Sequence, residues 1–133
     1  MNIVDVEGIG PVYGEKLEAV GVKTTDDLLQ RGATQKGREE LEAASGIGRV
    51  LILKWVNRVD LYRIDGVGSE YSDLLEVAGV DSIPELSYRN AANLTQTMAE
   101  ANAARNLVRR LPTLEMVTDW IEQAKKLPRV VEY

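Results

Sequence analysis

Three short segments of this chain place an apolar residue between two glycines: Gly8-Ile9-Gly10, Gly46-Ile47-Gly48 and Gly66-Val67-Gly68. Glycine permits the positive φ angles of tight turns, and the central Ile or Val can fill the core below the turn. Each segment precedes a predicted helix, whose first backbone N–H groups have no partner within the helix and can hold an anion. The chemistry on offer is therefore phosphate binding by backbone amides. The alternative is that these glycines only form tight turns.

The middle segment has basic residues beside it. Arg49 follows the second glycine directly, and Lys54 and Arg58 are four residues apart on the next predicted helix, so they share a face. A solvated helix face beside a turn is the alternative interpretation. We predict that phosphate binding, if present, uses the residues of this segment and helix: Gly46, Ile47, Gly48, Arg49, Lys54 and Arg58.

The first and third segments are secondary hairpins, formed by Gly8 with Gly10 and by Gly66 with Gly68. A carboxylate precedes each of them, Glu7 in the first and Asp65 in the third. A carboxylate beside a phosphate opposes binding, and the attraction of a helix N-terminus, about 1 kcal/mol, hardly offsets several such charges. For these two hairpins we favour the role of tight turns.

Charge is unevenly distributed within the net value of −5. Residues 61–100 contain seven acidic and two basic residues, whereas residues 101–133 contain four acidic and six basic ones. The second group predicts a basic patch at one end of the molecule that meets nucleic acid or the acidic stretch of a neighbouring copy. Its members are Arg105, Arg109, Arg110, Lys125 and Lys126, with Arg129 close by.

The 133-residue chain contains no histidine and no cysteine. Disulfides, Cys/His zinc sites and His or Cys catalysis are therefore excluded, and no phosphate-binding Walker sequence occurs. We expect no enzyme activity, no metal, no cofactor and no small-molecule substrate. The first residues have neither a basic nor an apolar leader segment, and the longest apolar run, Val50 to Leu53, is too short to span a membrane. A cytoplasmic protein is expected.

The elements that position these residues occur twice. When the sequence is slid against itself so that Gly8-Ile9-Gly10 falls on Gly66-Val67-Gly68, the residues after them also match: Tyr13 with Tyr71, Leu17 with Leu75, Gly21 with Gly79. Trp55 and Trp120 match after an insertion in the second half. We predict two domains, 1–60 and 61–133, packed as one compact body because each copy alone is marginal in size.

Each copy is predicted to contain only helices. After the first hairpin, an apolar stripe of Val12, Leu17 and Val20 predicts a buried helix face that ends at Gly21. A helix of the same length after the third hairpin ends at Gly79. Further helices are predicted over Gln35 to Ser45, from Arg49 to about Tyr62, from a cap at Asn90 or Asn93 through Met98, and after a cap at Thr113. A helix that includes Leu107 should stop before Pro112. Two further short helices should each begin with a capping box, one at Thr24 and the other at Ser82.

The pattern apolar-x-Gly-apolar-Gly followed by a helix resembles the helix-hairpin-helix family, on Val6 to Gly10 with Leu17 and Gly21, and on Ile64 to Gly68 with Leu75 and Gly79. Nearly the whole chain looks like DUF4332, a bacterial family of tandem helix-hairpin-helix domains of unknown function. The resemblance implies an all-α fold of two such repeats. It also implies either DNA-backbone binding through hairpin amides or a role in protein binding and assembly.

We expect a non-enzymatic binding module and favour a protein-interaction or assembly adaptor, with self-association or another protein as partner. Weak, sequence-independent DNA binding through the middle hairpin is the alternative. Trp55 and Trp120 should anchor the core, while Tyr13 and Tyr71 should pack behind the hairpins or contribute to an interface. The last residues, 128–133, should form an extended tail that docks on a partner.

Overall fold

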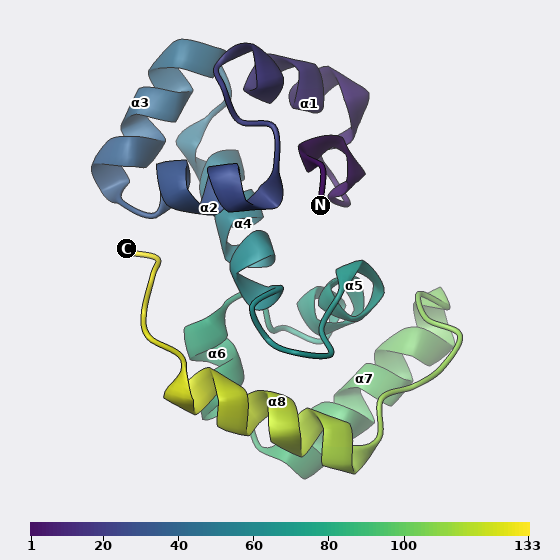
Figure 1. Ribbon diagram of the computed structural model, residues 1–133. Coiled ribbons are helices and arrows are strands. Elements are labelled where there is room, and N and C mark those ends of the chain that lie inside the picture. The colour runs from purple at the N-terminus through teal and green to yellow at the C-terminus, as the bar shows by residue number, and fades with distance from the viewer. The chain divides into compact units, whose positions relative to one another are not determined.

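The computed structural model describes residues 1–133 (Figure 1). Eight α-helices and one 3-10 helix follow one another, and the only β-type pairing is an isolated bridge between Asn2 and Thr24. The predicted all-α class is therefore confirmed. Internal contacts divide the chain into two units, residues 1–60 with 129–133 and residues 61–128.

The first unit is assembled around one core. It contains η1 (Ile3–Asp5), α1 (Gly10–Ala19), α2 (Thr25–Gly32), α3 (Gln35–Ser45) and most of α4 (Arg49–Leu61). Each of these elements contributes fully buried apolar side chains: Ile3, Leu17, Leu28, Leu41, Ile52 and Trp55. A Cβ on Gly32 would lie 2.4 Å from Cγ2 of Val56, so the close approach of α2 to α4 requires glycine there.

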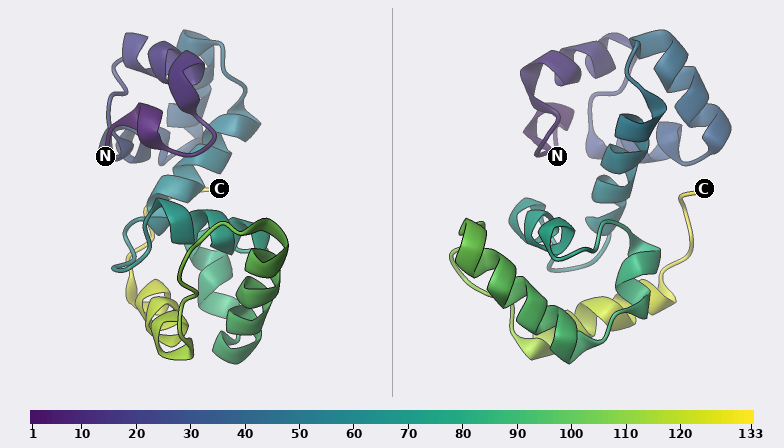
Figure 2. Two further views of the ribbon diagram at one scale, coloured as in Figure 1. Left: turned by 90° about the vertical axis from the view of Figure 1, so that its right-hand side faces the viewer. Right: turned by 180° about the vertical axis from the view of Figure 1, so that it is seen from behind.

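The second unit has its own core. Its helices are α5 (Ser69–Val77), α6 (Ile83–Tyr88), α7 (Ala91–Arg105) and α8 (Leu114–Lys126). The helix α8 packs on both α6 and α7, and α5 packs on α7 (Figure 2). Buried apolar side chains from all four helices join one cluster: Leu74, Leu75, Leu86, Leu94, Met98, Val117 and Trp120.

Local sequence signals placed most helix ends correctly. The helix α3 has the predicted bounds, and Thr113 caps α8 by accepting a hydrogen bond from the N–H of Met116 at 3.1 Å. Of the two caps proposed for α7, the structure uses Asn90, whose Oδ1 accepts from the N–H of Asn93 at 3.0 Å. These ends were predictable because each depends on a side chain only three residues from the amide that it binds.

The prediction of a helix through Leu107 is wrong. The helix α7 ends at Arg105, and Asn106 takes a left-handed conformation with φ +52°. The side chain of Asn102 then binds both the N–H and the carbonyl oxygen of Val108, at 2.9 and 3.1 Å. Asparagine tolerates the left-handed region well, so this residue ends the helix before Pro112 can.

The buried faces contain one further exception. Trp55 and Trp120 are 1% and 2% exposed, which confirms both as core anchors. Val12, predicted to belong to the buried stripe of α1, is instead 68% exposed. It lies in the first turn of α1, whose buried residues are Gly14 and Leu17, so the stripe begins later than the apolar pattern suggested.

The C-terminal tail packs within the first unit. The N–H of Glu132 donates to the carbonyl of Ala33 at 2.7 Å, and the hydroxyl of Tyr133 donates to Oδ1 of Asn57 at 2.7 Å. The guanidinium of buried Arg38 donates to the Glu132 carbonyl, and Val131 is 2% exposed. The tail, expected to dock on a partner, is thus held by residues of its own chain.

Candidate functional site

The middle hairpin forms the turn that its sequence predicts. Gly46 ends α3 with φ +77°, and its N–H donates to the carbonyl of Glu42 at 2.9 Å. The side chain of Ile47 is 3% exposed, and its N–H donates to Oγ of Ser45 at 3.1 Å. Gly48 then leads into α4, which begins at Arg49. The apolar residue between the glycines therefore fills the core, and the N-terminus of α4 lies next to the turn.

That helix N-terminus already has an anionic partner. Oε2 of Glu42 accepts a hydrogen bond from the backbone N–H of Arg49 at 2.8 Å. The Arg49 side chain also binds carboxylates, with Nε 3.0 Å from Glu42 Oε1 and Nη1 3.2 Å from Glu39 Oε1. Both acids come from α3, one and two turns before the hairpin. Glu42 therefore binds both the amide and the side chain of Arg49, and Glu39 binds the side chain alone.

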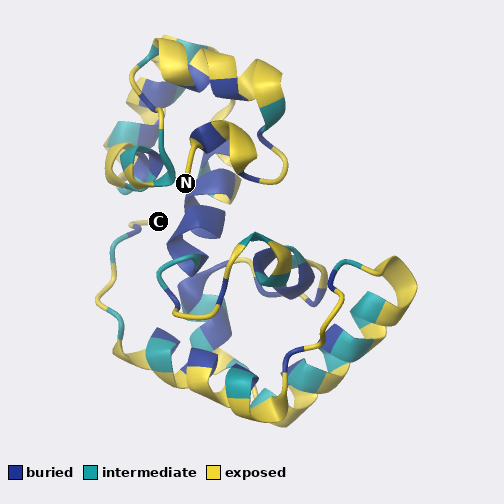
Figure 3. Ribbon diagram, turned by 45° about the vertical axis from the view of Figure 1, so that its right-hand side comes forward, coloured by how far each residue is buried: buried dark blue, intermediate teal, exposed yellow.

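The three bases assigned to this hairpin do not form one exposed face. Lys54 is exposed, but Arg58 is only 6% exposed. Residues 55–60 of α4 are all buried (Figure 3), so a shared helical face does not bring Arg58 to solvent. The 3.6-residue period gives a direction around the helix and not the depth at which the helix lies, so it did not indicate the burial of Arg58.

The first hairpin packs a glycine and a tyrosine against the same tryptophan. Gly8 has φ +89°, and a Cβ built on it would lie 3.8 Å from Nε1 of Trp55. The ring of Tyr13 meets the Trp55 ring at 5.1 Å between centroids and an interplanar angle of 63°. Ile9, between the glycines, is 3% exposed. Gly10, with φ +65°, begins α1.

The third hairpin repeats this arrangement more tightly. Gly66 has φ +96°, and a Cβ there would lie only 2.9 Å from Nε1 of Trp120. The ring of Tyr71 lies 5.2 Å from that of Trp120, and Val67 is buried before Gly68, which precedes α5. The glycine and tyrosine positions of the two hairpins are thus equivalent in the structure, as they are in the repeat of the sequence.

Three further side chains stabilise the segments around the hairpins, and none of them was singled out from the sequence: Arg31, Arg89 and Gln123. Arg31 donates to the carbonyl of Val20 at 2.9 Å, and Arg89 donates to that of Ala78 at 3.3 Å, so each closes the end of the helix that follows a hairpin. These two arginines again occupy equivalent positions of the repeat, which is a signal that the sequence did contain. Gln123 binds both the N–H and the carbonyl of Asp65, at 2.9 and 3.2 Å.

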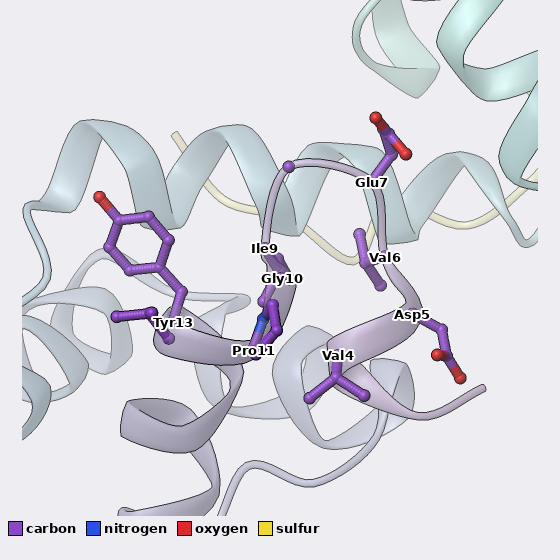
Figure 4. Close-up of a pocket in the computed structure, with 10 residues that line it drawn as sticks. Val4, Asp5, Val6, Glu7, Ile9, Gly10, Pro11 and Tyr13 are labelled. Atoms are coloured by element: carbon purple, nitrogen blue, oxygen red, sulfur yellow. The ribbon is translucent and has the colours of Figure 1, made fainter.

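An open hollow of about 540 Å³ lies at the first hairpin, lined by residues 4–13 (Figure 4). Figure 4 shows Asp5 and Glu7 on the limb before the turn, with carboxylates directed away from the ribbon, and Tyr13 on the limb after it. Both acids are exposed, and neither forms an ion pair. Val12 is 68% exposed and Val4 is 37% exposed. Acidic and apolar side chains thus share one accessible surface.

The predicted basic patch is divided by α8. Arg105, Arg109 and Arg110 are exposed at the end of α7 and in the loop before α8, whereas Lys125 and Lys126 are exposed in the last turn of α8. The 13 residues of α8 rise by about 20 Å at 1.5 Å per residue, so these two groups lie at opposite ends of the helix. One continuous patch does not form, because the intervening residues are helical.

The α7–α8 loop also presents apolar side chains. Leu111, which directly follows Arg110, is 44% exposed, and Leu114, the first residue of α8, is 52% exposed. Within the second unit this loop contacts the tyrosine that follows the third hairpin, because the hydroxyl of Tyr71 donates to the carbonyl of Arg110 at 3.0 Å. The loop is fixed there by Asn102, while the side chains of both arginines stay exposed.

The structure contains no group of three or more acidic side chains placed to hold a metal ion. None of its helices has the length and apolar character required to cross a membrane. A family model described as domain of unknown function (DUF4332) matches residues 7–127. No curated protein and no solved structure matches the chain.

Proposed function

The chain belongs to the DUF4332 family, and we propose that it is a non-enzymatic tandem helix-hairpin-helix module that binds protein partners. The repeat architecture is supported by side-chain arrangements that recur at equivalent positions of the two copies: Gly8 with Gly66, Tyr13 with Tyr71, and Arg31 with Arg89. A non-enzymatic role is supported by a sequence without histidine or cysteine.

The observation that carries the choice of protein over DNA is the pair of carboxylates at the middle hairpin. Glu42 occupies the amide of Arg49, and Glu39 and Glu42 together hold its guanidinium. These ion pairs are exposed, and each contributes less than about 1 kcal/mol, so their strength alone would not exclude a phosphate. The two negative charges remain beside the amide, however, and they repel any phosphate that displaces one of them.

The surface of the first hairpin fits a protein partner better than a polyanion. Its hollow combines exposed Val4, Val12 and Tyr13 with the unpaired acids Asp5 and Glu7. Apolar and aromatic side chains with charges at their edge are typical of protein interfaces, whereas phosphate contacts require basic residues.

DNA binding is tested by fluorescence anisotropy with labelled duplex and single-stranded DNA across a salt series. We expect no salt-sensitive binding by the unmodified protein. Glu39→Gln/Glu42→Gln should show weak, salt-sensitive DNA binding at low salt, since it removes two negative charges beside Arg49. Glu18→Gln/Glu115→Gln, which removes two exposed charges elsewhere, controls for net charge. Salt-dependent binding by the unmodified protein that is lost in Arg49→Glu would favour the DNA alternative.

Protein binding is tested by affinity capture with the unmodified protein and with Asp5→Lys/Glu7→Lys. A partner recovered by the first and lost with the second supports the proposal. A protein that is a strict monomer by light scattering, and that recovers no partner through this surface, contradicts it.

A further inference from the structure

The tyrosine that follows the first hairpin lacks a contact that its equivalent after the third hairpin has. Tyr71 donates its hydroxyl to the carbonyl of Arg110, so the α7–α8 loop lies against this tyrosine. Tyr13 occupies the matching position in the first repeat of the chain, and it is 36% exposed with no hydrogen bond to its hydroxyl. The first repeat has no loop of this kind, because its helices α3 and α4 are joined by only Gly46, Ile47 and Gly48.

The charges and apolar groups around Tyr13 complement those of the α7–α8 loop. Residues 4–13 contain two acids and no base, and residues 105–114 contain three arginines and no acid. Asp5 and Glu7 form no ion pair in the structure, and neither do the side chains of Arg109 and Arg110. Each of the two surfaces also exposes aliphatic side chains, which are Val4 and Val12 at the hollow and Leu111 and Leu114 beside the arginines.

We propose that the α7–α8 loop of a second copy of this chain docks on the hollow of the first hairpin, with Arg109 and Arg110 facing Asp5 and Glu7. This inference rests on the proposed protein-binding function and identifies the partner as another copy. The leucines beside the arginines cover Val12 and Tyr13, and removal of this apolar surface from water adds to the attraction between charges.

The two surfaces are different, so the contact is heterologous. Each chain carries one hollow and one loop, so an open assembly grows by addition at both ends until a ring closes. The mean mass should therefore rise with concentration above the 14.7 kDa of one chain. It should fall as salt is added, because the paired charges are exposed and screened.

The test uses sedimentation velocity and light scattering of the full chain. One variant, Asp5→Lys/Glu7→Lys, removes the acidic hollow, and the other, Arg109→Glu/Arg110→Glu, removes the basic loop. All four side chains are exposed without ion pairs, so both variants should fold, which circular dichroism verifies. Each variant alone should be a monomer, with the dissociation constant raised at least tenfold.

Mixing variants gives the sharpest result. In an equimolar mixture of the two variants, the lysines introduced at the hollow of the first variant pair with the glutamates introduced in the loop of the second. The unmodified loop of the first variant also still fits the unmodified hollow of the second. The mixture should therefore associate again although each component does not. Matched controls reverse exposed charges elsewhere, Glu18→Lys/Glu40→Lys and Lys125→Glu/Lys126→Glu, and should associate like the unmodified protein.

A monomeric unmodified protein at all concentrations overturns this inference, and so does association that persists unchanged in both variants. The proposed function is judged separately, by capture of another protein that is lost with Asp5→Lys/Glu7→Lys. Capture of such a protein by a strictly monomeric chain refutes self-association and retains the proposed function. Failure of both measurements contradicts the two together.

Discussion

At the scale of single residues, the two glycines that precede the buried Ile9 and Val67 differ in how closely tryptophan approaches them. Both Gly8 and Gly66 have positive φ, but a Cβ would lie 3.8 Å from the indole nitrogen at the first and 2.9 Å at the second. The longer contact is an ordinary van der Waals distance, whereas the shorter one requires the indole to move. Equivalent positions in the two copies are therefore unequal in their tolerance of a methyl group.

Alanine substitutions should reveal this difference. Gly8→Ala should destabilise the protein by about 1–2 kcal/mol, the usual cost of a left-handed residue with a side chain. Gly66→Ala should cost at least about 1 kcal/mol more, because the added methyl group displaces Trp120. Gly48→Ala is the control, since a Cβ there meets nothing within 4 Å, and its effect should stay within about 0.5 kcal/mol. Urea unfolding followed by circular dichroism gives the three values, and equal costs at Gly66 and Gly48 would contradict the argument.

The sequence located the glycine turns but not the groups that bind at them. Gly-Ile-Gly predicts a turn with a buried centre, and Ile47 is buried as expected. The capture of Arg49 by Glu39 and Glu42 depends on two helices meeting at the turn, which sequence spacing does not determine. The burial of Arg58 was missed for the same reason, since the neighbours of α4 come from distant parts of the chain.

At the scale of elements, the start of α2 is fixed by a reciprocal cap. Oγ1 of Thr24 accepts from the N–H of Asp27 at 3.1 Å, and the Asp27 carboxylate accepts from the N–H groups of Lys23 and Thr24, both at 3.1 Å. The capping box predicted at Thr24 is therefore confirmed. At the matching Ser82, the structure has the hydrogen bond from the N–H of Glu85 to the serine hydroxyl, which is one half of such a box.

Removing the cap should weaken the first unit in a pH-dependent way. Thr24→Ala should cost about 1 kcal/mol, and Thr24→Ser, which keeps the hydroxyl, should cost much less. The two backbone N–H groups, that of Lys23 first, lower the pKa of Asp27 below its ordinary value of 3.8. The carboxylate of Asp27 therefore binds a proton more readily in the unfolded chain than in the folded one. Its stabilising effect is present above pH 3.8 and is lost as the pH falls through the lower pKa of the folded protein.

Urea unfolding between pH 7 and pH 2 measures this contribution. Asp27→Asn should remove part of the loss of stability below pH 3.8, because an amide does not titrate. The exposed Asp26, which neighbours it on the same turn, provides the matched control as Asp26→Asn. Identical acid profiles for the two variants would show that the backbone hydrogen bonds to Asp27 do not affect stability.

At the scale of the whole molecule, the repeat in the sequence and the units in the structure have different boundaries. The internal repeat suggested domains at 1–60 and 61–133, whereas contacts place residues 129–133 with the first unit. The repeat compares each residue with its equivalent and contains no information on a tail that has no equivalent. The hydrogen bond between Arg38 and Glu132 spans 94 residues, and no local pattern predicts such a contact.

This tail should stabilise the first unit and leave the second unchanged. Removing residues 129–133 exposes the site of Val131 and takes one carbonyl acceptor from Arg38, which is 5% exposed. The lost burial and the lost hydrogen bond to a charged group should together cost about 2–4 kcal/mol. Hydrogen exchange, resolved by segment, should become faster in α2 and α3, because Arg38 and Ala33 hold the tail there.

Exchange in α7 and α8 should not change, since neither helix belongs to the unit that contains the tail. Tyr133→Phe is the graded control: it removes only the hydroxyl that donates to Asn57 and keeps both the buried Val131 and the Glu132 contacts. It should therefore produce a smaller increase than the truncation, in the same segments. An equal increase across both units after truncation would mean that the tail supports the whole chain, and the assignment of residues 129–133 to the first unit would be wrong.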